Sequence, residues 1–342
     1  MEELLAHCVR RGASDLHLSA GLPPMLRVDG DLGRMDAPPF GSGDLETALR
    51  GIMNGRQREE YDRFLETDFS FDVREIARFR VNAFRQNRGA AAVFRVIPSK
   101  VPTMETLGMG GVFEEISLKP RGLVVVTGPT GSGKSTTLAA MVDFVNERRA
   151  GHILTIEDPI EFVHPSKRCL VSQREVHRDT RGFNGALRAA LREDPDVILI
   201  GEMRDLETIR LALTAAETGH LVLGTLHTVS AGKTVDRIVD VFPAEEKAAV
   251  RAVLSESLQA VISQALLKRV GGGRVAAHEI MLCTPAIRNL IREGKVAQMV
   301  SAIQTGRGVG MQTLDGALLG LVEAGIVSRE AAREKARTPG DF

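Results

Sequence analysis

The feature that most constrains the fold is a glycine-rich segment, Gly128-Pro-Thr-Gly-Ser-Gly-Lys-Ser135, which follows the apolar run Leu123 to Val126. It matches the pattern GxxxxGK[ST], and a helical pattern that begins at Thr136 follows it. Glycines let successive backbone N–H groups turn towards phosphate oxygens, and the helix N-terminus adds partial positive charge at the same place. The segment therefore predicts a strand, a phosphate-binding loop and a helix, which together bind a nucleoside triphosphate.

Individual residues of this loop have predicted roles. Lys134 is expected to reach the β and γ phosphates, and the Ser135 hydroxyl is expected to bind Mg²⁺, which prefers oxygen ligands. The other predicted nucleotide contacts are the neighbouring residues Gly128, Thr130, Gly131, Ser132, Gly133 and Thr136. The sequence contains no guanine-specifying NKxD pattern, which favours ATP over GTP.

Short apolar runs continue to alternate with helical patterns after the loop, at 153–156, 197–200 and 221–223. Strands that are apolar on both faces and separated by helices indicate a parallel sheet covered on both sides. Residues 108–342 are thus predicted to form one α/β domain. From about residue 245 onward the helical period dominates, so we expect a helical appendage to end the chain.

Residues 1–97 have a different pattern, with alternating polar and apolar residues that predict a small antiparallel α+β domain. Within it, residues 45–64 carry apolar side chains at a helical spacing, which predicts one amphipathic helix. Pro98 and Pro102 oppose regular structure in the following segment. We therefore expect a linker at 98–107.

Composition excludes several classes of protein. Lys and Arg number 44 and Asp and Glu number 44, and the chain has one Tyr and no Trp, so nucleic-acid binding is disfavoured. The three cysteines lie far apart without a CxxC pattern, which fits a reducing compartment. No basic leader and no apolar run of about 18 residues is present, so a cytoplasmic protein is expected.

Carboxylates follow two of the predicted strands. Glu202 comes two residues after the apolar strand 197–200, and it is our predicted general base for water. Glu157, Asp158 and Glu161 follow the strand 153–156, and Glu161 is the second candidate. Acids are common in turns, so a solvated loop is the alternative interpretation of this cluster.

Histidines and arginines give weaker signals. His227 follows the strand 221–223 on the ligand side and is a candidate γ-phosphate contact, whereas His220 lies at the opposite end. In the N-terminal domain, arginines crowd one stretch, at Arg78, Arg80, Arg85, Arg88 and Arg95. Such a cluster is usually a solvated surface, but an arginine can also stabilise the charge of a γ-phosphoryl transition state.

A late segment predicts an amphipathic helix. Pro285 can begin a helix after Thr284 as its N-cap, and Ile287, Leu290 and Ile291 then form one apolar face. Arg288 and Arg292 lie on another face, where we expect them to be exposed. On physical grounds alone this is a packing helix.

Four segments resemble, in order, the Walker A, Asp box, Walker B and His box of the type II and type IV secretion ATPase superfamily: GPTGSGKST, ILTIEDPIEF, DVILIGEMRD and TGHLVLGTLHT. Residues 12–21, 78–84, 271–280 and 286–293 are similar to the pilus-retraction ATPases of twitching motility within that superfamily. The resemblance covers essentially the whole chain. No Cys lies between Cys169 and Cys283, so the tetracysteine zinc insertion common in pilus-extension relatives is missing.

The resemblance implies a PAS-like N-terminal domain, a RecA-like P-loop ATPase domain, and a homohexamer with nucleotide between the two domains. It implies an ATP- and Mg²⁺-dependent motor that extracts pilin subunits into the inner membrane. The motor would be cytoplasmic, peripheral at the pilus base, and would act with an inner-membrane platform protein and a paralogous retraction ATPase as partners.

The resemblance also assigns residues by motif position. Glu161 and Glu202 become the acidic catalytic pair, His227 a nucleotide contact, and Arg80 and Arg95 the arginines directed at phosphate. It further gives the late helix, with Ile287, Arg288, Leu290 and Arg292, a role in coupling hydrolysis to retraction. Two alternatives stay open: a nucleotide-gated regulatory or assembly module with little turnover, and a nucleic-acid translocase.

Overall fold

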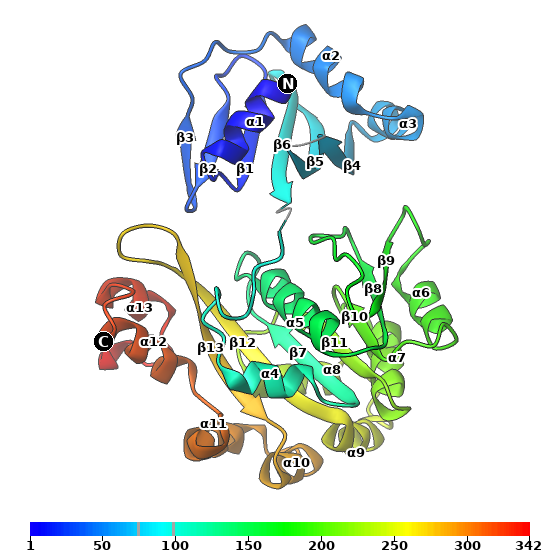
Figure 1. Ribbon diagram of the computed structural model, residues 1–342, viewed down its shortest axis with the longest axis vertical. Helices are drawn as coiled ribbons and strands as arrows, with labels where there is room; N and C mark the ends of the chain where they lie inside the picture. Colours follow the sequence, from blue (N-terminus) through cyan, green and yellow to red (C-terminus); the bar gives the residue numbers. More distant parts are fainter. Residues whose placement is uncertain (74–75, 98–99) are drawn as a thin grey trace. The chain divides into compact units, whose positions relative to one another are not determined.

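The computed structural model describes residues 1–73, 76–97 and 100–342, and its internal contacts divide the chain into two compact units (Figure 1). The N-terminal unit is Met1–Lys100 and the C-terminal unit is Val101–Phe342. The boundary falls inside the predicted linker at 98–107, of which residues 98 and 99 lie outside the described residues. Among the residues described, no helix is both long and apolar enough to span a membrane.

The N-terminal unit is an antiparallel sheet of six strands with three helices. The strand order is β3-β2-β1-β6-β5-β4, and every neighbouring pair is antiparallel, as predicted. Its core is built by inward-facing residues such as Phe79 and Phe94, with Tyr61 from a helix. The elements are α1 (Glu2–Arg10), β1 (Asp15–Ser19), β2 (Met25–Val28), β3 (Asp31–Arg34), α2 (Ser42–Ile52), α3 (Gly55–Phe64), β4 (Glu66–Val73), β5 (Ala77–Gln86) and β6 (Gly89–Ile97).

The prediction of a single helix over 45–64 is wrong, because the chain forms α2 and α3 with a break at Met53 and Asn54. Met53 is extended, and the Asn54 side chain accepts a hydrogen bond from the Gln57 N–H at 3.0 Å. The Gln57 side chain accepts one in return from the Asn54 N–H at 2.8 Å. This capping box begins a new helix, and it replaces the hydrogen bonds that a continuous helix would have made there.

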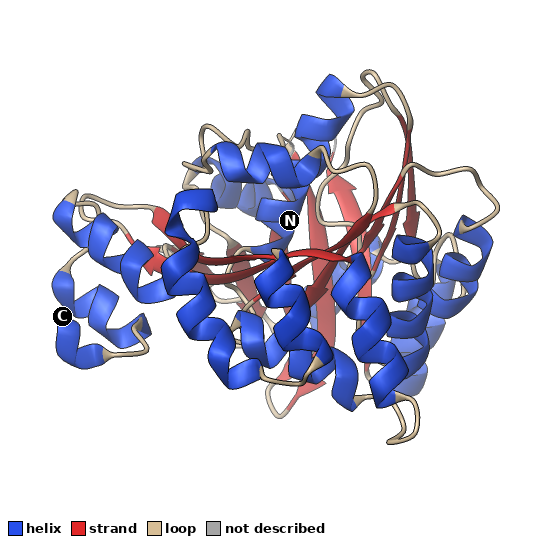
Figure 2. Ribbon diagram, turned by 90° about the horizontal axis from the view of Figure 1, so that it is seen from below, coloured by secondary structure: helices blue, strands red, loops and turns tan. Residues whose placement is uncertain are grey.

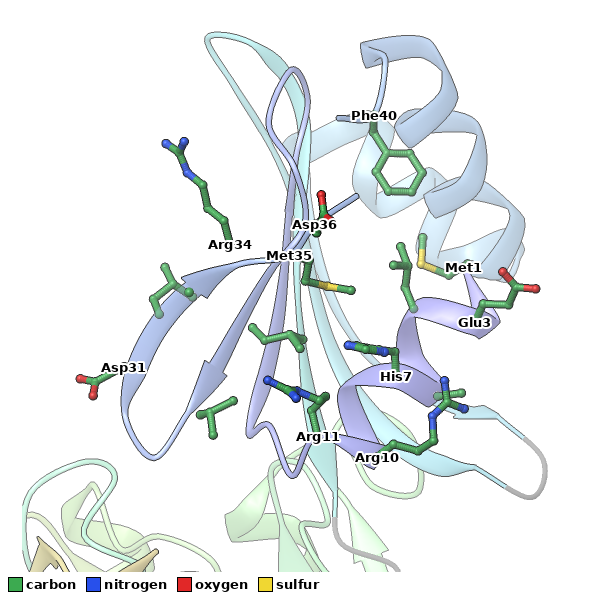
Figure 3. A pocket seen from close by; sticks show the side chains of 16 residues that line it. Met1, Glu3, His7, Arg10, Arg11, Asp31, Arg34, Met35, Asp36 and Phe40 are labelled. Atoms are coloured by element: carbon green, nitrogen blue, oxygen red, sulfur yellow. The ribbon is translucent and has the colours of Figure 1, made fainter. Parts of the chain in front are cut away.

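An open groove of about 1200 Å³ lies in the N-terminal unit between α1 and the strands β2 and β3 (Figure 3). Its lining mixes apolar side chains, among them Met35 and Phe40, with charged ones such as Arg11 and Asp36. None of the predicted site residues lines it.

The C-terminal unit is built around a sheet of seven strands in the order β13-β12-β7-β11-β10-β8-β9. All neighbours are parallel except β12 and β13, and the four strands predicted from apolar runs are present as β7, β8, β10 and β11. The strands are β7 (Gly122–Thr127), β8 (His152–Glu157), β9 (Leu170–Glu175), β10 (Val197–Ile200), β11 (Leu221–Leu226), β12 (Leu258–Lys268) and β13 (Arg274–Leu282).

Helices cover both faces of this sheet, as the apolar strands require (Figure 2). One face packs against α4 (Gly111–Ser117) and α5 (Lys134–Arg148) through side chains such as Phe113 and Met141. The other face packs against the helices α6 (Phe183–Ala190), α7 (Leu206–Glu217), α8 (Ala231–Asp240), α9 (Lys247–Ser257), α10 (Pro285–Arg292) and α11 (Met299–Thr305).

The prediction of an all-helical region from about residue 245 is wrong for residues 258–282. These residues form β12 and β13, two long antiparallel strands at the end of the sheet. Both strands are largely buried, so they lack the polar and apolar alternation that marks a half-exposed strand. The remainder is helical, with α10 and α11, the 3₁₀ segments Val296–Gln298, Gly306–Val309 and Pro339–Asp341, α12 (Leu314–Glu323) and α13 (Arg329–Lys335).

Candidate nucleotide site

The glycine-rich loop connects the carboxyl end of β7 to the N-terminus of α5, as the motif predicts. Gly128, Gly131 and Gly133 have φ angles of +149°, +77° and +88°, which L-residues with a side chain rarely adopt. A Cβ at Gly128 would lie 2.4 Å from the backbone oxygen of Gln264 on β12. All three glycines therefore suit the loop conformation, and Gly128 is also needed for the close packing of the loop against β12.

Lys134 is the first residue of α5, and its side chain is buried. Its ammonium group donates hydrogen bonds to the backbone oxygens of Gly128 and Pro129, at 2.9 and 3.1 Å. Burial lowers the pKa of Lys134, while the carboxylates of Glu202 and Glu161 act in the opposite direction. Both predicted catalytic carboxylates therefore favour the charged form of this lysine, and their catalytic roles stay predictions.

Glu202 follows β10, and its carboxylate has two cationic or polar neighbours. Arg204 donates a hydrogen bond to Oε2 at 2.7 Å, and Nε2 of His227 lies 3.0 Å from Oε1. Burial alone would raise the pKa of Glu202, but Arg204 and His227 outweigh it and hold this pKa below its ordinary value. The carboxylate is therefore ionised at neutral pH and held by contacts to both of its oxygens.

The loop after β11 brings His227 to this position. β11 lies next to β7 in the sheet, and the Thr127 hydroxyl at the end of β7 donates a hydrogen bond to the Thr228 backbone oxygen at 2.6 Å. The residue after His227 is thus tied to the end of β7, while His227 itself contacts Glu202. His220 lies at the other end of β11, where its Nδ1 is 3.0 Å from the Ala215 backbone oxygen.

The acidic segment after β8 is held by side chains from the edge strand β9. Gln173 donates a hydrogen bond to the Phe162 backbone oxygen at 2.9 Å, and a Glu175 carboxylate oxygen accepts one from the Ile160 N–H at 3.1 Å. These bonds fix the backbone on both sides of Glu161. Burial raises the pKa of Glu157 to about 7 although Thr155 and Gln173 donate hydrogen bonds to its carboxylate.

The two arginines predicted to face phosphate lie side by side in the N-terminal unit, because Arg80 on β5 is paired in register with Arg95 on β6. Arg80 donates to Asp68 with distances of 3.2 and 2.8 Å, and Arg95 donates to the buried Asp15 at 2.9 Å. Each guanidinium is therefore oriented by an acid on a neighbouring strand. Their contact with phosphate stays a prediction.

The predicted helix at 285–292 is present as α10, with the Thr284 hydroxyl accepting from the Ile287 N–H as its cap. Ile287 is fully buried and Leu290 packs against the same core, as predicted. The expectation that Arg288 is exposed is wrong, because its side chain is only 23% exposed. Its Nη1 donates to the backbone oxygens of two residues at the end of α9, Ser255 and Glu256, at 2.6 and 2.7 Å.

Arg292 differs from Arg288 in its surroundings. It forms an ion pair at 2.8 Å with the exposed carboxylate of Glu256. Arg292 therefore lies at the surface, whereas Arg288 joins α10 to the end of α9. Of the two charged residues assigned to coupling, Arg292 is the more accessible to a partner.

Sequence reasoning missed several residues that organise the site. Arg204 is a cation two positions after Glu202, but no pattern in the sequence distinguishes it from the many other arginines. Gln264 was visible as an amide within the apolar run 261–267, a pattern that often marks a polar group with a buried partner. The missed residues are Gln173, Glu175, Arg204 and Gln264.

A glycine-rich loop between strand and helix, with carboxylates after neighbouring parallel strands, defines a P-loop nucleotide-binding protein. The chain belongs to the type II/IV secretion system protein family, whose model matches residues 1–272. The resemblance predicted from the four sequence boxes is therefore confirmed.

Two relatives and one solved structure narrow this assignment. The chain is 72% identical to the type IV pilus retraction ATPase PilT of Pseudomonas aeruginosa over 340 residues, 99% of each chain. It is 60% identical to a twitching motility protein of Neisseria gonorrhoeae over 315 residues, 92% of this chain and 84% of the relative. A crystal structure of the pilus retraction motor PilT with bound ADP matches with a TM-score of 0.90 at 47% identity, covering 99% of this chain and 98% of the other. The predicted α/β ATPase fold is thereby confirmed.

Proposed function

We propose that the chain is an ATP-hydrolysing motor that drives retraction of type IV pili and thereby twitching motility. The observation that carries the proposal is the Glu202–His227 pair, which follows β10 and β11 in the same sheet as β7, the strand that leads to the buried P-loop lysine. This pair occurs in a chain that is 72% identical to a pilus retraction ATPase over its whole length. A regulatory module with little turnover would have no need of an ionised carboxylate that Arg204 and His227 hold in place.

The loop residues fit a nucleoside triphosphate. Positive φ angles at three glycines let backbone N–H groups face the phosphates, and Lys134 places a buried ammonium group beside them. Ser135, the second residue of α5, would supply a hydroxyl oxygen to Mg²⁺, which neutralises phosphate charge during transfer. Among the described residues no cluster of three acidic, histidine or cysteine side chains could hold a metal alone. We therefore assign Mg²⁺ to Ser135 together with the phosphates.

Glu202 is the residue that we assign to water activation. Its lowered pKa keeps the carboxylate ready to accept a proton, and contacts from Arg204 and His227 orient it. Glu161, held by the backbone bonds of its neighbours to β9, would act as the second acid of the site. His227 contacts this base and would act as the predicted nucleotide contact.

The complete motor in this proposal is a homohexamer with the two-domain organisation 1–97 and 108–342. Arg80 and Arg95 would complete a nucleotide site from the N-terminal domain, and their acid partners would orient them for that contact. The ring would work at the cytoplasmic face of the inner membrane with a platform protein, and a paralogous retraction ATPase would act with it.

Purified protein tests the enzymatic half of the proposal. Wild-type protein should release phosphate from ATP in the presence of Mg²⁺, and release that stays at background would support the regulatory module instead. A gene deletion tests the biological half: surface pili should accumulate while twitching stops. Loss of twitching without surface pili would indicate a role in pilus extension.

A further inference from the structure

Gln264 is a buried amide that touches the phosphate-binding loop from a strand far away in the sequence. It lies in β12, and its side chain is almost fully inaccessible. Its Nε2 donates a hydrogen bond to the Ser132 backbone oxygen at 2.7 Å, and its Oε1 accepts one from the Thr137 hydroxyl on α5 at 2.7 Å. One side chain thus joins the loop, the first turns of α5 and the sheet.

The loop packs against Gln264 on both sides of Ser132. A Cβ at Gly133 would lie 2.9 Å from Nε2 of Gln264, and a Cβ at Gly128 would lie 2.4 Å from its backbone oxygen. Two glycines of the motif are therefore required by their contact with this residue as well as by their φ angles. The path of the loop is set by β12.

The hydrogen bond to Ser132 has a consequence for the next peptide N–H. In a planar trans peptide the C=O of one residue and the N–H of the next point in opposite directions. Because the Ser132 C=O points to Gln264, the N–H of Gly133 points away from β12. Gly133 is one of the residues whose N–H groups bind phosphate in the motif.

We propose that Gln264 is a positioning residue for phosphate binding, which holds the Ser132 peptide so that the Gly133 N–H faces the nucleotide. This inference rests on the proposed nucleotide site. Gln264 itself need not touch the nucleotide, since it acts through the backbone of the loop. Its loss should therefore weaken nucleotide binding more than it slows the chemical step.

Two substitutions test this role. Gln264→Met keeps the length of the side chain and removes both hydrogen bonds, and it should weaken binding of a fluorescent ADP analogue by about tenfold or more. KM for ATP should rise by a similar factor, with a smaller change in kcat. Gln264→Glu keeps the acceptor for Thr137 but replaces the donor to Ser132 by a negative oxygen, so it should weaken binding at least as much.

A control separates positioning from general destabilisation. Ile262 lies on the same strand, is fully buried and is paired with Val126 of β7. Ile262→Val should lower the melting temperature and leave the Kd for the ADP analogue unchanged. Thr137→Val removes only the hydrogen bond to α5 and should change the Kd less than Gln264→Met does.

The proposal is overturned if a folded Gln264→Met or Gln264→Glu protein binds the ADP analogue within about twofold of wild type. It is also overturned if Ile262→Val weakens binding to the same extent at equal loss of melting temperature. Wild-type protein that binds nucleotide without hydrolysing it would contradict the proposed ATPase and still leave the effect of Gln264 measurable. Wild-type protein that binds no nucleotide would overturn both proposals.

Discussion

Replacing Arg288 by alanine should destabilise the C-terminal unit far more than replacing Arg292, although both arginines lie on α10. The Arg288 guanidinium donates to the backbone oxygens of Ser255 and Glu256 at the end of α9 and to that of Cys283 at 3.1 Å. The last carbonyls of a helix have no partner within the helix, so Arg288 completes the C-terminus of α9. Alanine would leave these oxygens without their donor.

The structure sets the size of the effect. A hydrogen bond from a charged donor contributes about 1.5 to 3 kcal/mol when it is buried. The side chain of Arg288 is 23% exposed, so water can replace part of its contacts and we expect a total loss of about 2 to 4 kcal/mol. Arg292 is 47% exposed and its partner Glu256 is 68% exposed, so its ion pair should contribute about 0 to 0.5 kcal/mol.

Urea denaturation monitored by circular dichroism measures the difference. We expect a clearly lower midpoint for Arg288→Ala in the transition of the C-terminal unit, and a midpoint close to wild type for Arg292→Ala. Arg288→Lys should lie between wild type and alanine, since an ammonium cannot reproduce the planar guanidinium fork. Equal midpoints for the two alanine variants would refute the capping role of Arg288.

Four further predictions follow from the site and its surroundings. Lys134→Ala should abolish hydrolysis with the fold intact, because the loop loses its ammonium group; wild-type turnover would contradict the site. Glu202→Gln should bind ATP without releasing phosphate. If Glu202→Gln hydrolysed ATP normally and Glu161→Gln did not, Glu161 would be the general base instead of Glu202. Arg292→Glu should retain ATPase activity and stop twitching if α10 transmits force, whereas normal twitching would leave α10 a packing helix. Burial lowers the pKa of His278 to about 4, so as the pH falls the unfolded chain takes up a proton at this histidine before the folded chain does. The free energy of unfolding should therefore fall by about 2 kcal/mol from pH 6.5 to 5. His278→Leu should weaken this pH dependence, and a variant with the pH dependence of wild type would exclude His278 as its source.

Much of the site was predictable because its signals are local in the sequence. The glycine-rich loop lies between an apolar strand and a helix, so its place in the fold follows from contiguous residues. Glu202 and His227 follow predicted strands, and parallel neighbours bring such positions to one edge of the sheet. The contact between Glu202 and His227 is the consequence of that topology.

Other features depend on contacts between distant residues. The bond from Gln264 to Ser132 joins residues 132 positions apart, and it exists because β12 lies next to β7 in the sheet. Arg288 could not be distinguished from Arg292 by helical spacing, because only the end of α9 makes their environments different.

The break between α2 and α3 was predicted wrongly although its signal is local in the sequence. Asn54 followed by Gln57 is a readable capping pair, and it was obscured by the apolar spacing that runs through it. In this case a helix boundary signal in the sequence outweighed the periodicity on which the prediction rested.

The most direct test of the proposed motor is to watch labelled pili on cells that lack the chain and carry either the wild-type gene or the Glu202→Gln variant. Wild-type protein should restore retraction. Glu202→Gln protein, present at the same level and able to bind ATP, should leave pili extended and the cells unable to twitch. Retraction at the wild-type rate in cells carrying only Glu202→Gln, with no phosphate release by the purified variant, would contradict the claim that hydrolysis at this site drives retraction.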